Sequence, residues 1–154
     1  WLLVFTYAAV IFFKVIKNLD KRKSKIFFIL SALYLIIESL IKIWLANAYG
    51  GWLVINSLEH FIWSFCFSAI IYYPLLNIFK NHSYLIFSLF LISFVSFSGI
   101  LIELLEFIPR IELSATNPNY YPDTIRDLFL NIAGAACFVS LNFIRQIVSK
   151  SRFE

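Results

Sequence analysis

Ionisable and amide side chains occur inside hydrophobic stretches of this sequence, where membrane helices usually carry none. Asp123, Asp127 and Asn131 are spaced four residues apart near the start of the last such stretch, so they share one face of a helix. A carboxylate at the centre of a membrane helix costs about 2.5–3.5 kcal/mol even on lenient insertion scales. We therefore expect this face to point into a helix bundle or a wet cavity and to meet polar groups there.

Two other hydrophobic stretches carry candidate partners for this face. Glu59 and His60 lie near the start of one stretch, and Glu103 and Glu106 lie at the end of the next. Carboxylates clustered with a histidine can act as general acid and base on a bound substrate, and such groups gather at active sites. They also gather in structural networks, so the simpler interpretation of His60 is a hydrogen-bonded histidine in a buried polar network.

A metal site is a further interpretation of the same side chains, because imidazole and carboxylate groups both bind Zn²⁺ and Mn²⁺. Zinc-binding helices often show HxxxH or HExxH spacing, and neither spacing occurs here. We therefore expect no metal and no cofactor.

Transport and charge neutralisation are the remaining interpretations. Intramembrane acids commonly mark ion paths, but here they fall in one half of the predicted bilayer, and the paired Gly/Pro breaks of broken-helix transporters are missing. We rank transport below a binding or catalytic pocket. Glu38 with Lys42, and Arg126 with a nearby acid, are read as neutralising pairs, since unpaired charge is costly in a membrane.

Composition and hydropathy predict the elements that position these residues. Of 154 residues, 61% are hydrophobic and 14% are charged, and the mean hydropathy is +0.83, as in integral membrane proteins. The sequence has no stretches in which apolar and polar residues alternate with a period of two, as they do in the strands of a membrane barrel. The prediction is an all-α, polytopic membrane helix bundle, a single transmembrane domain over residues 1–154 with five spans at about 1–17, 26–46, 53–79, 84–107 and 124–148.

Local signals refine these spans. Pro74 is expected to kink the third span or to mark its end, and Asp123 or Thr124 is expected to cap the fifth. Gly99 and Gly134 are predicted to let the fourth and fifth spans pack closely. The first span is near the lower length limit for crossing a bilayer, and the sequence does not begin with Met. We therefore expect further residues upstream.

Charge along the chain predicts its orientation in a cell membrane. By the positive-inside rule the short basic run 18–25, read as a loop, is cytoplasmic. The N-terminus is then outside, the C-terminus is cytoplasmic, and the polar groups lie in the outer half of the bilayer. The basic residues predicted on the cytoplasmic side are Lys17, Lys21, Arg22, Lys23, Lys25, Lys80, Arg145, Lys150 and Arg152. They form no stripe with stacking aromatics, so a nucleic-acid partner is not expected.

The order of three short motifs resembles that of VanZ-like membrane proteins, a family named for a factor linked to glycopeptide (teicoplanin) resistance. The motifs are His60-Phe61, Ile102-Glu103-Leu104-Leu105-Glu106 and Asp127-x-x-x-Asn131-x-x-Gly134-Ala135, in consecutive predicted spans. The resemblance covers about residues 52–140. It implies a small multi-span bundle in a prokaryotic envelope, without an established activity, and it picks out His60, Glu103, Asp127 and Asn131.

Two departures from the family pattern accompany this resemblance. Glu106 stands where the family often has Gln, and Glu59 directly precedes the histidine. The start Asp123-Thr124-x-x-Asp127 also resembles a separate, uncharacterised family of bacterial membrane proteins.

The resulting hypothesis is a VanZ-like envelope protein with a polar pocket at the outer leaflet. It would contact membrane lipids, bind or act on a lipid-linked or amphipathic envelope component, and so influence glycopeptide tolerance. The alternative is a non-catalytic membrane subunit or small transporter whose network is structural or ion-coupling. Whether the chain is an enzyme, and whether it has a protein partner or self-associates, stays open. The predicted catalytic residues are His60, Glu103 and Asp127, and the predicted substrate-binding residues are Glu59, Glu106, Arg126 and Asn131.

Overall fold

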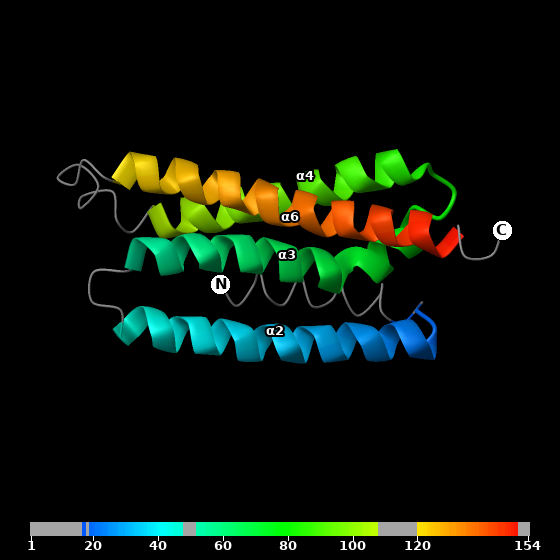
Figure 1. Cartoon of the computed structure of the whole chain (residues 1–154), viewed down its shortest axis with the longest axis horizontal. Helices are drawn as coiled ribbons and strands as arrows, with labels where there is room; N and C mark the ends of the chain where they lie inside the picture. The colour runs from blue at the N-terminus through cyan, green and yellow to red at the C-terminus, as the bar shows by residue number, and fades with distance from the viewer. Residues whose placement is uncertain (1–16, 18, 48–51, 108–119, 151–154) are drawn as a thin grey trace.

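Four long helices lie side by side in the computed structural model, which describes residues 17, 19–47, 52–107 and 120–150 (Figure 1). With the labels of Figure 1 they are α2 (Lys21–Asn47), α3 (Trp52–Ile78), α4 (Tyr84–Phe107) and α6 (Tyr120–Lys150). Each is long and apolar enough to cross a membrane. The described part of the chain is therefore an all-α bundle of membrane-spanning type, as the sequence predicts.

The number of spans differs from the prediction of five. The described residues contain four helices of spanning length, which match the second to fifth predicted spans. The predicted first span, at about residues 1–17, lies almost wholly outside the described residues.

The start of α2 differs from the prediction of a loop over residues 18–25. The helix begins at Lys21 because Asp20 caps it: its Oδ1 atom accepts a 2.8 Å hydrogen bond from the Lys23 backbone N–H. This hydrogen bond holds the pKa of the exposed Asp20 carboxyl below its ordinary value. Lys and Arg are good helix formers, so the basic run forms the first turns of the helix.

The predicted third span, about residues 53–79, agrees with α3, which continues through Pro74 to Ile78, so the proline does not end the helix. The predicted cap of the fifth span was wrong. Helix α6 begins already at Tyr120, which places Asp123 inside the first turn and Pro122 where proline is well tolerated. Asp123 and Thr124 are therefore helical residues and not caps.

Helix α3 is the centre of the bundle. It packs against α2, α4 and α6, most extensively against α6, and α6 also packs against α4. The buried apolar core lies where the later part of α3 meets the early part of α4 and the middle of α6; it includes Ile71, Phe87, Leu91, Val95 and Phe138. Large apolar side chains on the outer faces of all four helices are exposed, as expected for surfaces that contact lipid.

The two ends of the bundle differ in polarity. Helices α3 and α6 begin, and α2 and α4 end, at the same end of the bundle (Figure 1). We call the half next to this end the polar half, because the intramembrane acids and His60 lie there. The opposite end, called the basic end, carries the first residues of α2, Lys80 after α3, and Arg145 late in α6.

Glycines at two positions allow close helix packing. A methyl group added at Gly99 of α4 would lie 2.8 Å from Cγ of Asn131 on α6, as the predicted contact of the fourth and fifth spans requires. Gly134 of α6 instead lies against α3, where an added methyl would overlap the Phe61 carbonyl oxygen and lie 3.0 Å from Ser64 Cβ. The predicted role of Gly134 is thus confirmed, but its neighbour is α3 and not α4.

Candidate functional site

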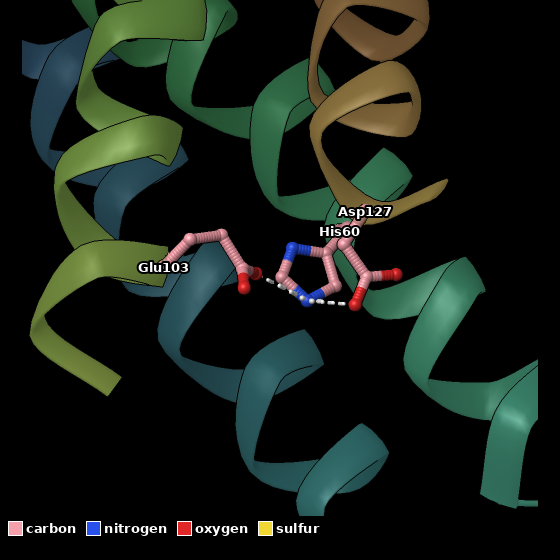
Figure 2. A group of neighbouring side chains, drawn as sticks. All are labelled: His60, Glu103 and Asp127. Carbon is pink, nitrogen blue, oxygen red and sulfur yellow. Dashed lines mark ion pairs between the residues drawn. The ribbon is translucent and has the colours of Figure 1, made fainter. Parts of the chain in front are cut away.

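Three ionisable side chains from three helices point toward one another in the polar half (Figure 2). The His60 Nε2 atom of α3 lies 3.4 Å from Oε1 of Glu103 on α4 and 3.5 Å from Oδ2 of Asp127 on α6. The side chains of His60, Glu103 and Asp127 are 16%, 11% and 4% exposed. The structure thus brings together the three residues predicted to be catalytic, here called the His60 cluster.

The helix directions explain why these side chains meet. His60 and Asp127 lie about two turns after the starts of α3 and α6, and Glu103 lies about one turn before the end of α4. Since these starts and this end share one end of the bundle (Figure 1), the three residues have nearly the same depth. The close packing of α6 against α3 then brings the helix face that carries Asp127 against the helix face that carries His60.

Asp127 is held on both of its oxygens. Its Oδ2 atom accepts a 2.9 Å hydrogen bond from Nδ2 of Asn56, and its Oδ1 atom lies 3.3 Å from Nη2 of Arg126. Arg126 also forms an ion pair with Asp123, so the predicted neutralising pair of Arg126 with an acid is present. These contacts fix the carboxylate that faces His60.

Asn56 is a residue of the site that the sequence prediction did not include. It precedes His60 by four residues, so the two share one face of α3. This four-residue spacing is the signal in the sequence that could have identified Asn56 as a site residue. The face of α3 that is turned toward α6 carries a polar residue at each of three successive turns, namely Asn56, His60 and Ser64.

Asn131 lies one turn deeper than Asp127 on α6 and contacts α3 and α4. Its Oδ1 atom accepts a 2.8 Å hydrogen bond from the Ser64 hydroxyl, and Gly99 leaves room for its amide. At 1% exposure its side chain is enclosed by the protein. The predicted face of Asp127 and Asn131 is therefore confirmed as an interior face, while a contact of Asn131 with substrate stays a prediction.

Glu59 faces a different neighbour from His60. It is buried and forms an ion pair with Lys42 of α2, whose Nζ atom also lies 3.8 Å from Oε1 of Glu38. The predicted Glu38–Lys42 pair is thus present, with Glu59 as a further acid. This second group connects α2 to α3 and lies beside the His60 cluster rather than in it.

The structure describes the side chain of only one of the two remaining predicted binding residues, Arg126 and Glu106. The side chain of Arg126 is 34% exposed at the edge of the cluster. Glu106 belongs to the last turn of α4, and its side chain lies outside the described part of the structure. Binding roles for Glu59, Glu106 and Arg126 remain predictions.

The cluster has the groups for two kinds of chemistry. An imidazole between two carboxylates can hold or pass a proton to a bound group. Each of His60, Glu103 and Asp127 also offers one possible metal-ligand atom, and these atoms all lie within 4.8 Å of one another.

Comparisons with known proteins found no match to this chain. No protein-family model, curated protein or solved structure matches the chain. The likeness to VanZ-like proteins therefore rests on the three motifs quoted above.

Proposed function

We propose that this chain is a multi-span protein of the cell envelope, of the VanZ-like kind, that binds a lipid-linked or amphipathic envelope component at the His60 cluster. Through that binding it influences tolerance to glycopeptides. The observation that carries the proposal is the convergence of one histidine and two carboxylates from three helices within an apolar bundle. Ionisable groups at such positions are costly and usually functional.

The distribution of basic residues supports an outer-leaflet location for this cluster. Lys21, Arg22, Lys23 and Lys25 start α2, and Lys80 and Arg145 lie at the same basic end. Under the positive-inside rule this end is cytoplasmic. The polar half, with the His60 cluster, then belongs to the outer half of the membrane, where lipid-linked envelope components are found.

The exposure of the cluster supports ligand access. His60 and Arg126 retain partly exposed side chains, whereas the side chain of Asp127 is almost fully buried. A ligand headgroup at the rim would meet a guanidinium and an imidazole first, with the Asp127 carboxylate behind them. In this arrangement His60 is placed to hold or move a proton of the bound group.

A structural role is the second candidate, and specific contacts favour it for part of the polar set. Glu59 is paired with Lys42, and Asn131 is bonded to Ser64. Direct contacts of this kind hold helices together, and they account for these two residues without a ligand. The two candidates therefore differ in what they assign to His60.

Replacement of His60 separates the two candidates. We expect His60→Ala and Asp127→Asn to abolish the teicoplanin tolerance that the wild-type chain confers on a susceptible bacterial host, with folded yield and melting retained. His82→Ala is the matched control, because this exposed histidine lies in the turn after α3, at the basic end. Unchanged tolerance in a folded His60→Ala protein would contradict the proposal. Collapse of the folded yield in both site variants would favour the structural role.

A further inference from the structure

We propose that the His60 cluster binds one divalent transition-metal ion of the zinc class, with His60 Nε2, one Glu103 oxygen and one Asp127 oxygen as ligands. The ligands come from α3, α4 and α6. The inference rests on the proposed function, in which the His60 cluster is the binding site, and it adds a metal ion to that site. It runs against the expectation from spacing motifs, which describe sites whose main ligands share one helix.

The distances within the cluster are those between ligands of a common ion. In a tetrahedral site with bonds of about 2.0–2.2 Å, neighbouring ligand atoms are separated by roughly 3.3–3.6 Å. The two nitrogen–oxygen distances at His60 are 3.4 and 3.5 Å. Both are longer than the usual 2.7–3.2 Å of an N–H···O hydrogen bond. The two carboxylate ligand atoms lie within 4.8 Å of each other, close enough to reach an ion bonded to the imidazole by rotation of the side chains.

The direction of approach supports the same conclusion. Both carboxylate oxygens face a single imidazole nitrogen, Nε2 of His60 (Figure 2). An N–H group shared between two acceptors makes two weaker, bent hydrogen bonds, whereas the lone pair on that nitrogen can bind an ion that both oxygens also bind. The convergence on one atom is therefore better suited to an ion than to a pair of hydrogen bonds.

The charges of the described side chains also balance with a divalent ion. Asp123, Asp127 and Glu103 supply three carboxylates, and Arg126 offsets one of them through its ion pairs. A divalent ion bound to a neutral His60 brings two positive charges to the other two carboxylates. Its charge therefore suits this set of acids, because buried charge is costly unless it is paired.

The surroundings of Asp127 resemble the outer shell of a metal site. Ligating carboxylates are themselves usually hydrogen-bonded, and this orients them. Asn56 donates to Oδ2 of Asp127 and Arg126 lies beside Oδ1. Three protein ligands leave a fourth tetrahedral position open, as in catalytic rather than structural zinc sites. A water molecule or an anionic oxygen of the bound envelope component, such as a phosphate oxygen, fits that position.

Metal loading of the purified full chain in lipid nanodiscs tests the proposal. The protein is stripped with a chelator, dialysed against Zn²⁺ or Co²⁺, and assayed for bound metal and for the visible absorption of Co²⁺. We expect one ion per chain, a rise in melting temperature on loading, and a Co²⁺ spectrum of low coordination number. Asn56→Ala is expected to weaken binding about 10–100-fold, as outer-shell substitutions do.

Isosteric substitutions of the ligands provide the decisive comparison. Glu103→Gln and Asp127→Asn should lose the bound ion and the metal-dependent rise in melting temperature. Glu38→Gln, which changes a carboxylate outside the cluster, and His82→Ala should retain both. A wild-type protein without stoichiometric metal overturns the proposal by itself, and so does unchanged loading in folded ligand variants. Metal binding without any effect on teicoplanin tolerance would refute the proposed function and leave the metal site standing.

Discussion

A methyl group at Gly134 is expected to force α3 and α6 apart. In Gly134→Ala the new Cβ would overlap the Phe61 carbonyl oxygen and lie 3.0 Å from Ser64 Cβ and 3.1 Å from the Phe65 backbone nitrogen. Carbon atoms pack at about 3.5–4.0 Å, so the helices have to separate by roughly 0.5–1 Å at this point. The obstacle is mostly backbone, which cannot rotate away as a side chain can.

The size of the effect follows from three contributions. Overpacking of this kind costs about 1–3 kcal/mol. The separation stretches the 2.8 Å hydrogen bond from Ser64 to Asn131, and interhelical hydrogen bonds in membranes contribute about 0.6 kcal/mol on average. Against this, Ala is favoured over Gly in a helix by roughly 0.5–1 kcal/mol. The expected net loss in the free energy of unfolding is about 1–3 kcal/mol.

Reversible unfolding in mixed detergent micelles measures this loss. Ser140→Thr is the matched control, because it adds one methyl group at an exposed position of the same helix, and its effect should stay within about 0.5 kcal/mol of zero. A Gly134→Ala protein as stable as the wild type would refute the close contact of α3 and α6. If the metal site is correct, the same variant should also bind Zn²⁺ more weakly, although no ligand is changed.

Two further pairs of substitutions test the polar contacts. Ser64→Ala should destabilise the fold by about 1–3 kcal/mol, because it leaves a buried Asn131 oxygen without its donor. Ser68→Ala should have little effect, since that hydroxyl bonds a carbonyl of its own helix; equal effects of the two in unfolding measurements would contradict this assignment. Lys42→Met should cost about 2–3 kcal/mol by leaving Glu59 buried without its cation, and adding Glu59→Gln should restore most of the melting temperature. A Lys42→Met protein as stable as the wild type would show that the ion pair of Lys42 with Glu59 contributes nothing to stability.

The site could be predicted to a large extent because helix geometry fixes depth and face. Four-residue spacing placed Asp127 and Asn131 on one interior face, and the structure has both buried. Counting residues from the ends of hydrophobic runs placed His60, Glu103 and Asp127 at one depth, and they are in contact distance. Both arguments need only the period and rise of a helix.

The rotation of α3 about its axis could not be predicted in the same way. Glu59 and His60 are adjacent in the sequence, yet Glu59 faces α2 and His60 faces α4 and α6. Successive residues point about 100° apart around a helix, so a helix with three neighbours sends them to different partners. Which neighbour lies on which side depends on tertiary packing, and the sequence alone does not contain it.

Helix ends were the least predictable part of the fold. Hydropathy marks where apolar residues begin, but helices continue beyond the membrane core when capping and propensity allow. The basic start of α2, capped by Asp20, and the start of α6 at Tyr120 both extend past the apolar run. A hydropathy boundary is therefore a bilayer boundary rather than a helix boundary.

The parallel direction of α3 and α6 has a consequence for biosynthesis. Two neighbouring helices that run the same way cannot be joined by a short turn, so the chain has to cross back through α4 before α6 can pack beside α3. During synthesis the earlier helices enter the membrane first, and at that stage His60 and Glu103 lack the carboxylate of Asp127. The site is completed only when the last helix docks, so a chain that ends before residue 120 would lack the site.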